Sequence, residues 1–449
     1  MFPTTPNETP GCAEVLRRWP AGRPVAIRWN AQPDSGGSVV FGEPITTRTA
    51  RTAPELEALL AEVGTAGFNE PSAGAGWFGW ISYDAGQLLE PAARAAHLGA
   101  IADRLWPLAA FQRIENSFEL KTGHGINQCL DAELVDALAG SAPNEEPRYH
   151  IEPLDAAANR KDYIAGVERI IEYIRAGDAY QVNLAHRLSS RFNGSSRCIF
   201  ADLAERASPW HGGYFEADGY ALASLSPELF LEADFRSGAV RTRPMKGTRA
   251  FVPGTDAAAC AELDASAKDR AELAMIVDLM RNDLGRVCEL GSVRVEQERR
   301  IEKHASGVMQ STATVAGTMR RGTTLNELLR ATFPPGSVTG APKIRAMQII
   351  DELEPVKRGP YCGTMLWLGD DGKLEANVMI RTACLSHAAA GSTLDYSTGA
   401  GIVSDSNADG EWAETLMKAQ VLRQVIPRAA FRAGDGAAGE LEPFTNVSV

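Results

Sequence analysis

The sequence predicts an α+β fold, in which helices and strands are mixed without the regular strand–helix–strand alternation of a parallel α/β protein. Three observations support this prediction. Segments with helical periodicity and segments with strand-like alternation follow one another irregularly along the 449 residues. The chain is 44% hydrophobic and 23% charged, which is typical of a globular protein with a large buried core. No repeat of the length that indicates a solenoid or propeller is present.

The N-terminal region is expected to be rich in strands. Short apolar runs at 24–29, 39–41 and 77–83 are broken by Gly and Pro, as is typical of strands separated by turns. A polar, Pro-containing stretch at 140–153 follows, and it is either a surface loop or a linker.

We therefore divide the chain into three regions. Residues 1–150 form the strand-rich N-terminal region, and residues 151–427 carry the sharper motifs described below. Residues 428–449 form a tail rich in Gly, Ala and acidic residues, which we expect to be frayed.

Three amphipathic helices are predicted in the second region. From Asp162, apolar residues recur at the spacing of one helical face, and Gly177 is a C-terminal stop signal. A second helix spans Leu273 to Leu284, and a third begins at about Gly410. Strand-like runs lie between these helices at 180–188, 224–232, 364–368, 376–382 and 393–396.

The charge balance argues against nucleic-acid or membrane-surface binding, since both need a basic face. The formal net charge is −12. The N-terminus lacks the basic start and apolar run of a signal peptide, and no apolar stretch reaches the roughly 18 residues of a membrane span. The seven cysteines are dispersed without a CxxC pair, which is typical of reduced thiols. We expect a soluble cytoplasmic protein.

Several carboxylates have a spacing compatible with a metal site. Glu411 and Glu414 are three residues apart on the third predicted helix, so they share a face. Glu272 lies on the second predicted helix, one turn after Asp269. Carboxylate oxygens of this kind suit Mg²⁺, although a solvated pair of exposed Glu residues is the simpler interpretation.

Lys246 lies in a basic segment of an otherwise acidic protein. Four basic residues fall within 241–249, and crowding by Arg249 together with partial burial would favour the free amine that a nucleophile needs. A solvated strand end is the alternative. The glycine-rich segments 336–343 and 399–401 complete no nucleotide-binding motif, and they are either backbone donors to an anion or ordinary turns.

Taken together and in this order, these segments resemble component I of the chorismate-utilising enzymes. That family contains anthranilate synthase, isochorismate synthase and aminodeoxychorismate synthase. The resemblance runs from about Tyr163 to Gln424 and is looser at 76–86. It is carried by residues 177–184, 226–228, the Lys246 motif, 267–272, 276–285, 333–347, 380–382, 399–406 and 411–415.

The resemblance implies one large α+β unit. Two large, mostly antiparallel β-sheets would pack as a sandwich with helices outside, and chorismate would bind in a cleft beside the core. The boundary near residue 150 would then be an edge in sequence similarity within one folded unit.

The resemblance also implies roles for individual residues. Lys246 would attack C2 of chorismate while Glu228, as general acid, protonates the departing C4 hydroxyl; ammonia would then add at C4 and expel the lysine. Glu272 and Glu414, with Glu411 nearby, would hold Mg²⁺. The implied substrate-binding residues are Gln181, Gly247, Thr248, Ser337, Tyr361, Arg381, Gly399 and Gly401.

Three positions discriminate within the family. Members that add water carry a lysine where Gln181 stands, and anthranilate synthases typically carry alanine at Lys246 and a catalytic histidine at Gln310. The chain therefore resembles the aminodeoxychorismate synthases of para-aminobenzoate and folate synthesis more than anthranilate synthase. A non-catalytic chorismate-binding subunit is a further alternative, but it would be expected to lack one of Glu228, Lys246, Glu272 or Glu414.

The source of ammonia is expected to be another protein. Glutamine hydrolysis needs an activated Cys thiolate, and no cysteine of this chain lies in a recognisable glutaminase motif. The resemblance implies a separate glutamine amidotransferase subunit (component II) that passes ammonia to this chain.

Overall fold

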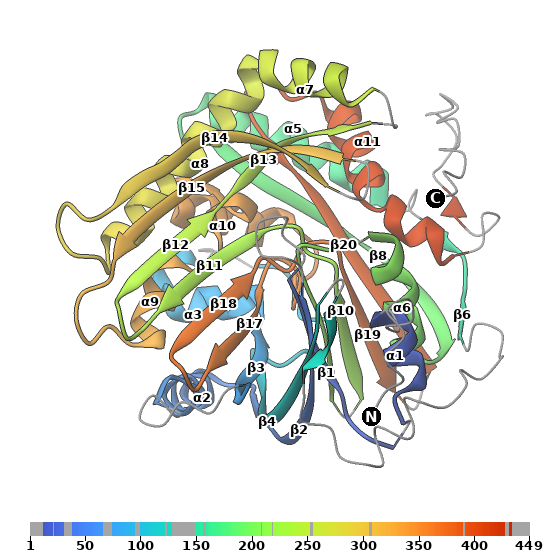
Figure 1. The fold of residues 1–449 in the computed structure, drawn as a ribbon. Helices are drawn as coiled ribbons and strands as arrows, with labels where there is room; N and C mark the ends of the chain where they lie inside the picture. Colours follow the sequence, from blue (N-terminus) through green and yellow to red (C-terminus); the bar gives the residue numbers. More distant parts are fainter. Residues whose placement is uncertain are drawn as a thin grey trace.

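The computed structural model (Figure 1) describes residues 12–20, 22–30, 38–65, 74–94, 99–121, 124–127, 149–155, 159–207, 209–217, 219–251, 255–304, 308–388, 391–426 and 431–432. The predicted tail at 428–449 lies outside these residues except for Phe431 and Arg432, and so does most of the predicted boundary at 140–153.

Almost all strands of the described residues join into one antiparallel sheet that wraps into a barrel-like form. One half contains β8 (Gln181–Gly194), which is flanked by β6 (Tyr149–Ile151) and β16 (Gly340–Ala341) and continues into β20 (Gly391–Ile402), β19 (Thr382–Ala388), β10 (Tyr220–Ser224) and β9 (His211–Ala217). The order continues through β1 (Ala26–Asn30), β2 (Ser38–Ala50), β4 (Ala109–Lys121) and β3 (Gly76–Ile81).

The other half of the sheet begins at the strand that pairs with β3. It contains β17 (Thr364–Gly369), β18 (Lys373–Asn377), β11 (Leu229–Asp234), β12 (Ala239–Arg243) and β15 (Val308–Thr318), which also pairs with β13 (Met245–Ala250) and β14 (Arg294–His304). The short β5 (His124–Asn127) extends β4, and β21 (Phe431–Arg432) pairs in parallel with β7 (Leu154–Asp155).

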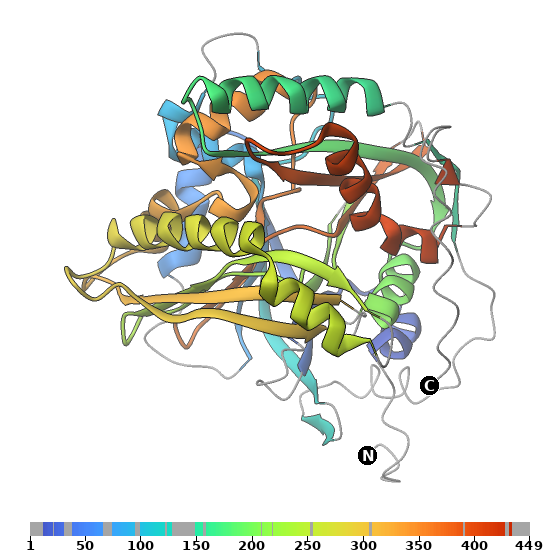
Figure 2. The same cartoon turned by 90° about the horizontal axis from the view of Figure 1, so that it is seen from above.

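Helices pack against the outside of both halves. The helices α5 (Arg160–Arg175) and α10 (Lys343–Leu353) contact β8, and α11 (Ala408–Lys418) contacts β20 and α5. On the other half, α7 (Asp256–Ala265) and α8 (Ala267–Gly285) contact β13 and β15. Figure 2 shows α5 lying over β8 and α8 lying over the strands of the second half.

The remaining helices are shorter or lie at the edges. They are α1 (Cys12–Arg18), α2 (Ala53–Thr65), α3 (Gly86–Leu89), α6 (Ser196–Ala207) and α9 (Leu325–Thr332), with the 3₁₀ turns η2 (Tyr83–Ala85), η3 (Pro91–Ala93), η5 (Gly336–Val338) and η6 (Gln420–Gln424). No helix of the described ranges is long and apolar enough to cross a membrane. Within the same ranges six of the seven cysteines are free thiols, and Cys129 lies outside them.

The predicted α+β class and the antiparallel sheet with outer helices are confirmed. Strands from both sides of residue 150 share the sheet, since β1 pairs with β9 and β3 with β17. The division into residues 1–150 and 151–427 as regions of one folded unit stays a prediction. The three predicted helices are present as α5, α8 and α11, and Gly177, with φ of 85°, follows the end of α5.

Two predicted strands are wrong. The run 224–232 spans the end of β10, an irregular segment and the start of β11, and the run 376–382 spans the end of β18, a similar segment and the start of β19. The first irregular segment is buried and the second is partly buried, and the two are joined by a hydrogen bond in which Ser226 Oγ donates to Val378 O at 2.6 Å. The prediction failed because apolar residues continue through both segments, although the backbone there leaves the sheet. These segments contain Glu228 and Arg381.

Candidate active site

Lys246, Glu228 and Ser337 form the centre of the candidate site. Lys246 lies on β13, Glu228 lies in the irregular segment before β11, and Ser337 lies in η5. Lys246 Nζ lies 3.4 Å from the backbone oxygen of Ser337 and donates to it. Glu228 is 3% exposed, and the Ser337 side chain is near enough to its carboxyl to lower the pKa that burial raises. Ser337 therefore lies beside an amine and a carboxyl group that the sequence separates widely.

Burial changes the acidity of both ionisable groups in this centre. Burial lowers the pKa of Lys246, and the nearby carboxylates of Glu272 and Glu228 only partly offset this effect. Burial also raises the pKa of Glu228 to about 7, although the Ser337 side chain and Lys246 act in the other direction. Both shifts favour the uncharged forms, a neutral amine and a protonated carboxyl. These are the forms that a nucleophile and a general acid require.

The strands β8 and β20 form the adjacent wall. Gly401 lies close to Gln181 and Lys246: a Cβ at position 401 would lie 2.5 Å from Gln181 Nε2 and 3.3 Å from Lys246 Nζ. Gln181 is fully buried, and neither side-chain polar atom has a hydrogen-bond partner among the described residues. A buried amide without partners is rare in proteins, so Gln181 is available to a ligand.

Lys418 contributes a second cation that the sequence analysis did not include. Its Nζ donates to Gly399 O at 2.8 Å and lies 2.6 Å from Glu414 Oε1. Lys418 also acts electrostatically on Lys246, lowering its pKa. The signal in the sequence is its position four residues after Glu414, which places both side chains on one helical face.

Two lysines lie beside the three predicted metal-binding carboxylates, Lys268 near Glu272 and Glu411 and Lys418 against Glu414. Lys268 Nζ lies 3.9 Å from Glu272 Oε1 and 4.0 Å from Glu411 Oε1, while Ser406 Oγ donates to Glu411 Oε1 at 2.6 Å. Burial raises the pKa of Glu272 and of Glu411, and the charge of Glu414 adds to both shifts. Burial alone would raise the pKa of Glu414, but Lys418 lowers it below its ordinary value.

These carboxylates fit Mg²⁺ in chemistry. All donors are carboxylate oxygens, which Mg²⁺ prefers, and their mutual repulsion is the kind that a divalent cation relieves. Within the described ranges, however, no three acidic, His or Cys side chains are gathered closely enough to hold a metal ion. Metal binding by Glu272, Glu411 and Glu414 therefore stays a prediction.

Gly247 and Thr248 continue β13 beyond Lys246. Gly247 has φ of 70°, and a Cβ there would lie 2.8 Å from Leu263 Cδ1, so only glycine suits this position. Thr248 lies opposite Gln310 on β15, and Gln310 Nε2 donates to Thr248 Oγ1 at 3.1 Å.

Tyr361 and Arg381 are less closely connected to this centre. Tyr361 is 4% exposed and precedes Cys362, whose thiol is within electrostatic reach of Glu228. Burial lowers the pKa of Arg381, and its guanidinium forms no ion pair with any described residue. Its backbone oxygen accepts from Leu225 N at 3.0 Å. Among the described residues, the half-buried Arg381 guanidinium is therefore a cation available to an anionic ligand.

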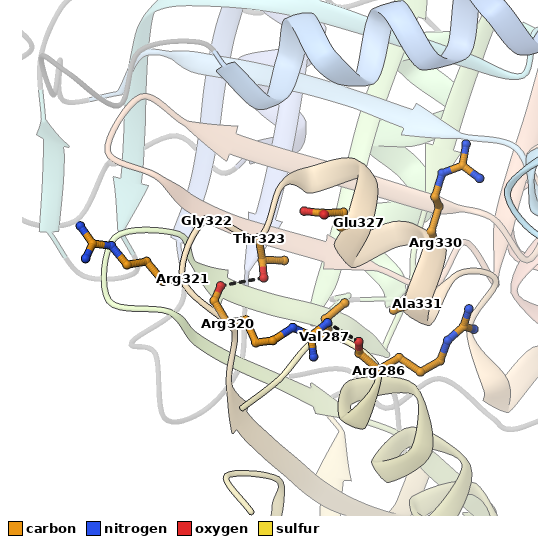
Figure 3. Close-up of a pocket in the computed structure, with 9 residues that line it drawn as sticks. All are labelled: Arg286, Val287, Arg320, Arg321, Gly322, Thr323, Glu327, Arg330 and Ala331. Atoms are coloured by element: carbon orange, nitrogen blue, oxygen red, sulfur yellow. Dashed lines mark hydrogen bonds between the residues drawn. The ribbon is translucent and has the colours of Figure 1, made fainter. Parts of the chain in front are cut away.

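Two cavities of the described structure lie elsewhere. One of about 390 Å³ is lined by Arg286, Arg320, Arg321, Arg330 and five other residues (Figure 3). The side chains of Arg321 and Arg330 point away from each other in this view, and Arg320 is bound to the backbone oxygens of Cys288 and Arg286. A second, of about 300 Å³, is lined partly by Trp106 and Lys357. Neither contains a predicted site residue.

The raised pKa of Glu228 predicts a pH-dependent stability. Because its folded pKa of about 7 exceeds the ordinary value, the folded protein holds this proton more tightly than the unfolded chain. This stabilisation is fully present below the unfolded pKa and is lost as pH rises through about 7. Glu228→Gln, which keeps the shape without the charge, should therefore raise the free energy of unfolding at pH 8 by on the order of 1–3 kcal/mol.

Denaturant unfolding at pH 5 and pH 8 checks this expectation. The increase in the free energy of unfolding that Glu228→Gln causes should be clearly smaller at pH 5 than at pH 8. An equal effect at both pH values would contradict a protonated Glu228 in the folded protein. Glu262→Gln is the control, since Glu262 is exposed and pairs with Arg249.

This fold and this site define a class of protein. Residues 26–424 match the family described as chorismate binding enzyme, and the chain belongs to that family.

Particular relatives can now be compared. The chain is 41% identical over 275 residues to aminodeoxychorismate synthase component 1 of Klebsiella aerogenes, a match that covers 60% of this chain and 59% of that one. It is 34% identical over 391 residues to an anthranilate synthase component 1 of Haloarcula marismortui, covering 80% of this chain and 77% of the relative. The match thus spans less than two thirds of the Klebsiella protein's length.

A solved structure supports the same assignment of fold. Anthranilate synthase component I from Streptococcus pneumoniae superposes with a TM-score of 0.73 at 27% identity, over 85% of this chain and 91% of that one. The predicted fold and the predicted family are therefore confirmed.

Proposed function

We propose that this protein is the chorismate-aminating component of an aminodeoxychorismate synthase, which forms 4-amino-4-deoxychorismate for para-aminobenzoate and folate synthesis. The observation that carries the proposal is the Lys246–Ser337–Glu228 centre. Its amine has a lowered pKa and its carboxyl a raised one, and paired groups with opposed shifts are typical of an acid and a nucleophile in one reaction.

The reaction would proceed in two displacements. The neutral amine of Lys246 forms a bond to C2 of chorismate, both ring double bonds shift, and the C4–O bond breaks as Glu228 gives its proton to the departing hydroxyl, which leaves as water. Ammonia then forms a bond to C4, both double bonds shift back, and the C2–N bond breaks to release the neutral Lys246 amine. A proton of the new ammonium group returns to Glu228. Covalent catalysis of this kind replaces one difficult step by two easier ones.

The other residues would bind the substrate. Chorismate carries two carboxylates, and Arg381 would bind one of them; Lys418, beside Gly399, would reach the substrate only if it left Glu414. Tyr361, Gln181, Ser337, Thr248 and the backbone at Gly247, Gly399 and Gly401 would supply the remaining polar contacts. Mg²⁺, held by Glu272 and Glu414 with Glu411 nearby, would neutralise a substrate carboxylate when bound.

Anthranilate synthase is the second candidate function. The Haloarcula relative, which this chain matches over more of its length than the Klebsiella protein, favours it. Lys246 and Gln310 argue against it: Lys246 offers a nucleophile, and the Gln310 amide cannot exchange the protons needed to eliminate pyruvate. A product that keeps its enolpyruvyl group agrees better with these two residues.

An assay with ammonium salt tests the proposed function and the predicted partner together. At mildly alkaline pH, where free ammonia is present, the purified chain should convert chorismate to 4-amino-4-deoxychorismate. It should give para-aminobenzoate only after a separate lyase is added. Glutamine should support turnover only when a glutamine amidotransferase subunit is added, because no cysteine lies in a recognisable glutaminase motif and burial raises the pKa of Cys362, Cys384 and Cys12, which disfavours their thiolates.

Two results would contradict this proposal in different ways. Anthranilate fluorescence in the ammonium assay would establish the second candidate function. Glutamine-dependent turnover by the chain alone would mean that it contains its own glutaminase site.

A further inference from the structure

Gln310 forms a single side-chain hydrogen bond at the edge of the proposed site. It lies opposite Thr248 in the β13–β15 pairing, and its Nε2 donates to Thr248 Oγ1 at 3.1 Å. The side chain is 6% exposed, and its Oε1 has no partner in the described part of the chain. A buried acceptor without a partner destabilises a protein, so a purely structural role would be better served by an apolar residue of the same size.

The hydrogen bond from Gln310 determines what the Thr248 hydroxyl can do. A threonine hydroxyl has one proton to donate and two lone pairs to accept with. Because Oγ1 accepts from Gln310, its proton remains free, and no described residue accepts it. Thr248 is therefore held as a hydrogen-bond donor toward something other than the protein.

The backbone around Thr248 is fixed as well. The β13–β15 pairing is irregular between Lys246 and Thr248, where Gly247 has φ of 70° and leaves no space for a side chain. Gly247 thus fixes the backbone conformation directly after Lys246, and the hydrogen bond from Gln310 fixes the side-chain orientation of Thr248. Both constraints act next to the proposed nucleophile.

We propose that Gln310 is a positioning residue, which holds the Thr248 hydroxyl so that its proton is donated to an oxygen of bound chorismate. The proposal rests on the proposed function for the identity of the substrate. Gln310 is an amide and does not titrate, so the donor is oriented in the same way at every pH used for the reaction. A histidine at this position would change its charge near pH 6.5.

The experiment compares chorismate binding and turnover in four proteins: wild type, Gln310→Met, Thr248→Val and the double variant. Each single variant should raise both KM and the calorimetric Kd for chorismate by roughly 3- to 10-fold, the effect of one neutral hydrogen bond. The value of kcat should change little, as expected when uniform binding is lost. Because both residues act through one contact, the double variant should be no weaker than the weaker single variant.

Gln112 provides a matched control. It is 1% exposed on β4, its Nε2 donates to Glu216 O at 2.6 Å, and its Oε1 also lacks a partner in the described structure. Gln112→Met should alter thermal stability but leave KM and Kd unchanged. A Gln310→His variant should bind chorismate with a pH dependence near pH 6.5 that wild type lacks.

The outcomes separate this proposal from the proposed function. Unchanged Kd and KM in Gln310→Met, or additive losses in the double variant, would overturn the positioning role alone. Wild type that binds chorismate without forming 4-amino-4-deoxychorismate would overturn the proposed function, and the Kd series would still decide the role of Gln310.

Discussion

Lys246→Ala should reduce ammonia-dependent formation of 4-amino-4-deoxychorismate by at least about 100-fold. In the proposed reaction Lys246 forms the bond to C2, and Lys418, which acts electrostatically on Lys246, is engaged with Glu414 and Gly399 O. The variant should keep its fold, because the Lys246 amine makes a single long hydrogen bond of 3.4 Å. Steady-state kinetics with thermal unfolding as a companion measurement checks both statements.

A covalent adduct provides a direct test of the same residue. Wild type mixed with chorismate in the absence of ammonia should gain the mass of chorismate less one water. After proteolysis the adduct should map to Lys246 and should be absent from Lys343, a second lysine whose pKa burial lowers and which instead pairs with Asp283 at 2.5 Å. Full activity in Lys246→Ala would rule out the covalent mechanism and leave direct addition of ammonia to the ring.

The helices that carry the site were predictable because their signals are local. Apolar periodicity predicted α5, α8 and α11, and stop signals such as Gly177 predicted where α5 ends. The irregular segments at 225–228 and 378–381 were not predictable in this way. They are stabilised by bonds between distant parts of the chain, such as Ser226 Oγ to Val378 O, and their apolar residues are buried as those of a strand would be.

The motifs named candidate site residues, but they did not predict how these residues lie relative to one another. Ser337 is expected as a donor to substrate, and the structure adds that its backbone oxygen accepts from Lys246 and that its side chain lies near the Glu228 carboxyl. The bond between Gln310 and Thr248 depends on the pairing of β13 with β15 across 62 residues. Such long-range pairing is set by tertiary structure and leaves no periodic signal in a single sequence.

Glu272→Gln and Glu414→Gln should each remove Mg²⁺ dependence and lower activity by about 100-fold or more. Each change deletes one charged ligand from a site with few others. The charge of Glu414 raises the pKa of Glu272, and Lys418 pairs with Glu414 and lowers its pKa. Loss of Mg²⁺ binding should also be measurable by calorimetry without substrate. Glu411→Gln should have a smaller effect, because Ser406 already occupies one oxygen of that carboxylate at 2.6 Å.

Matched controls lie on the same two helices. Asp278→Asn on α8 and Asp409→Asn on α11 remove exposed carboxylates that pair with Arg281 and Arg160, so neither should alter Mg²⁺ dependence. In the described structure Lys418 pairs with Glu414 and Lys268 approaches both Glu272 and Glu411, so Mg²⁺ must displace Lys418 from Glu414 to use that carboxylate. Lys418→Met should therefore tighten Mg²⁺ binding in calorimetry. If Glu272→Gln or Glu414→Gln keeps normal activity at low Mg²⁺, the residue concerned is no metal ligand, and the lysines alone balance the charge of these carboxylates.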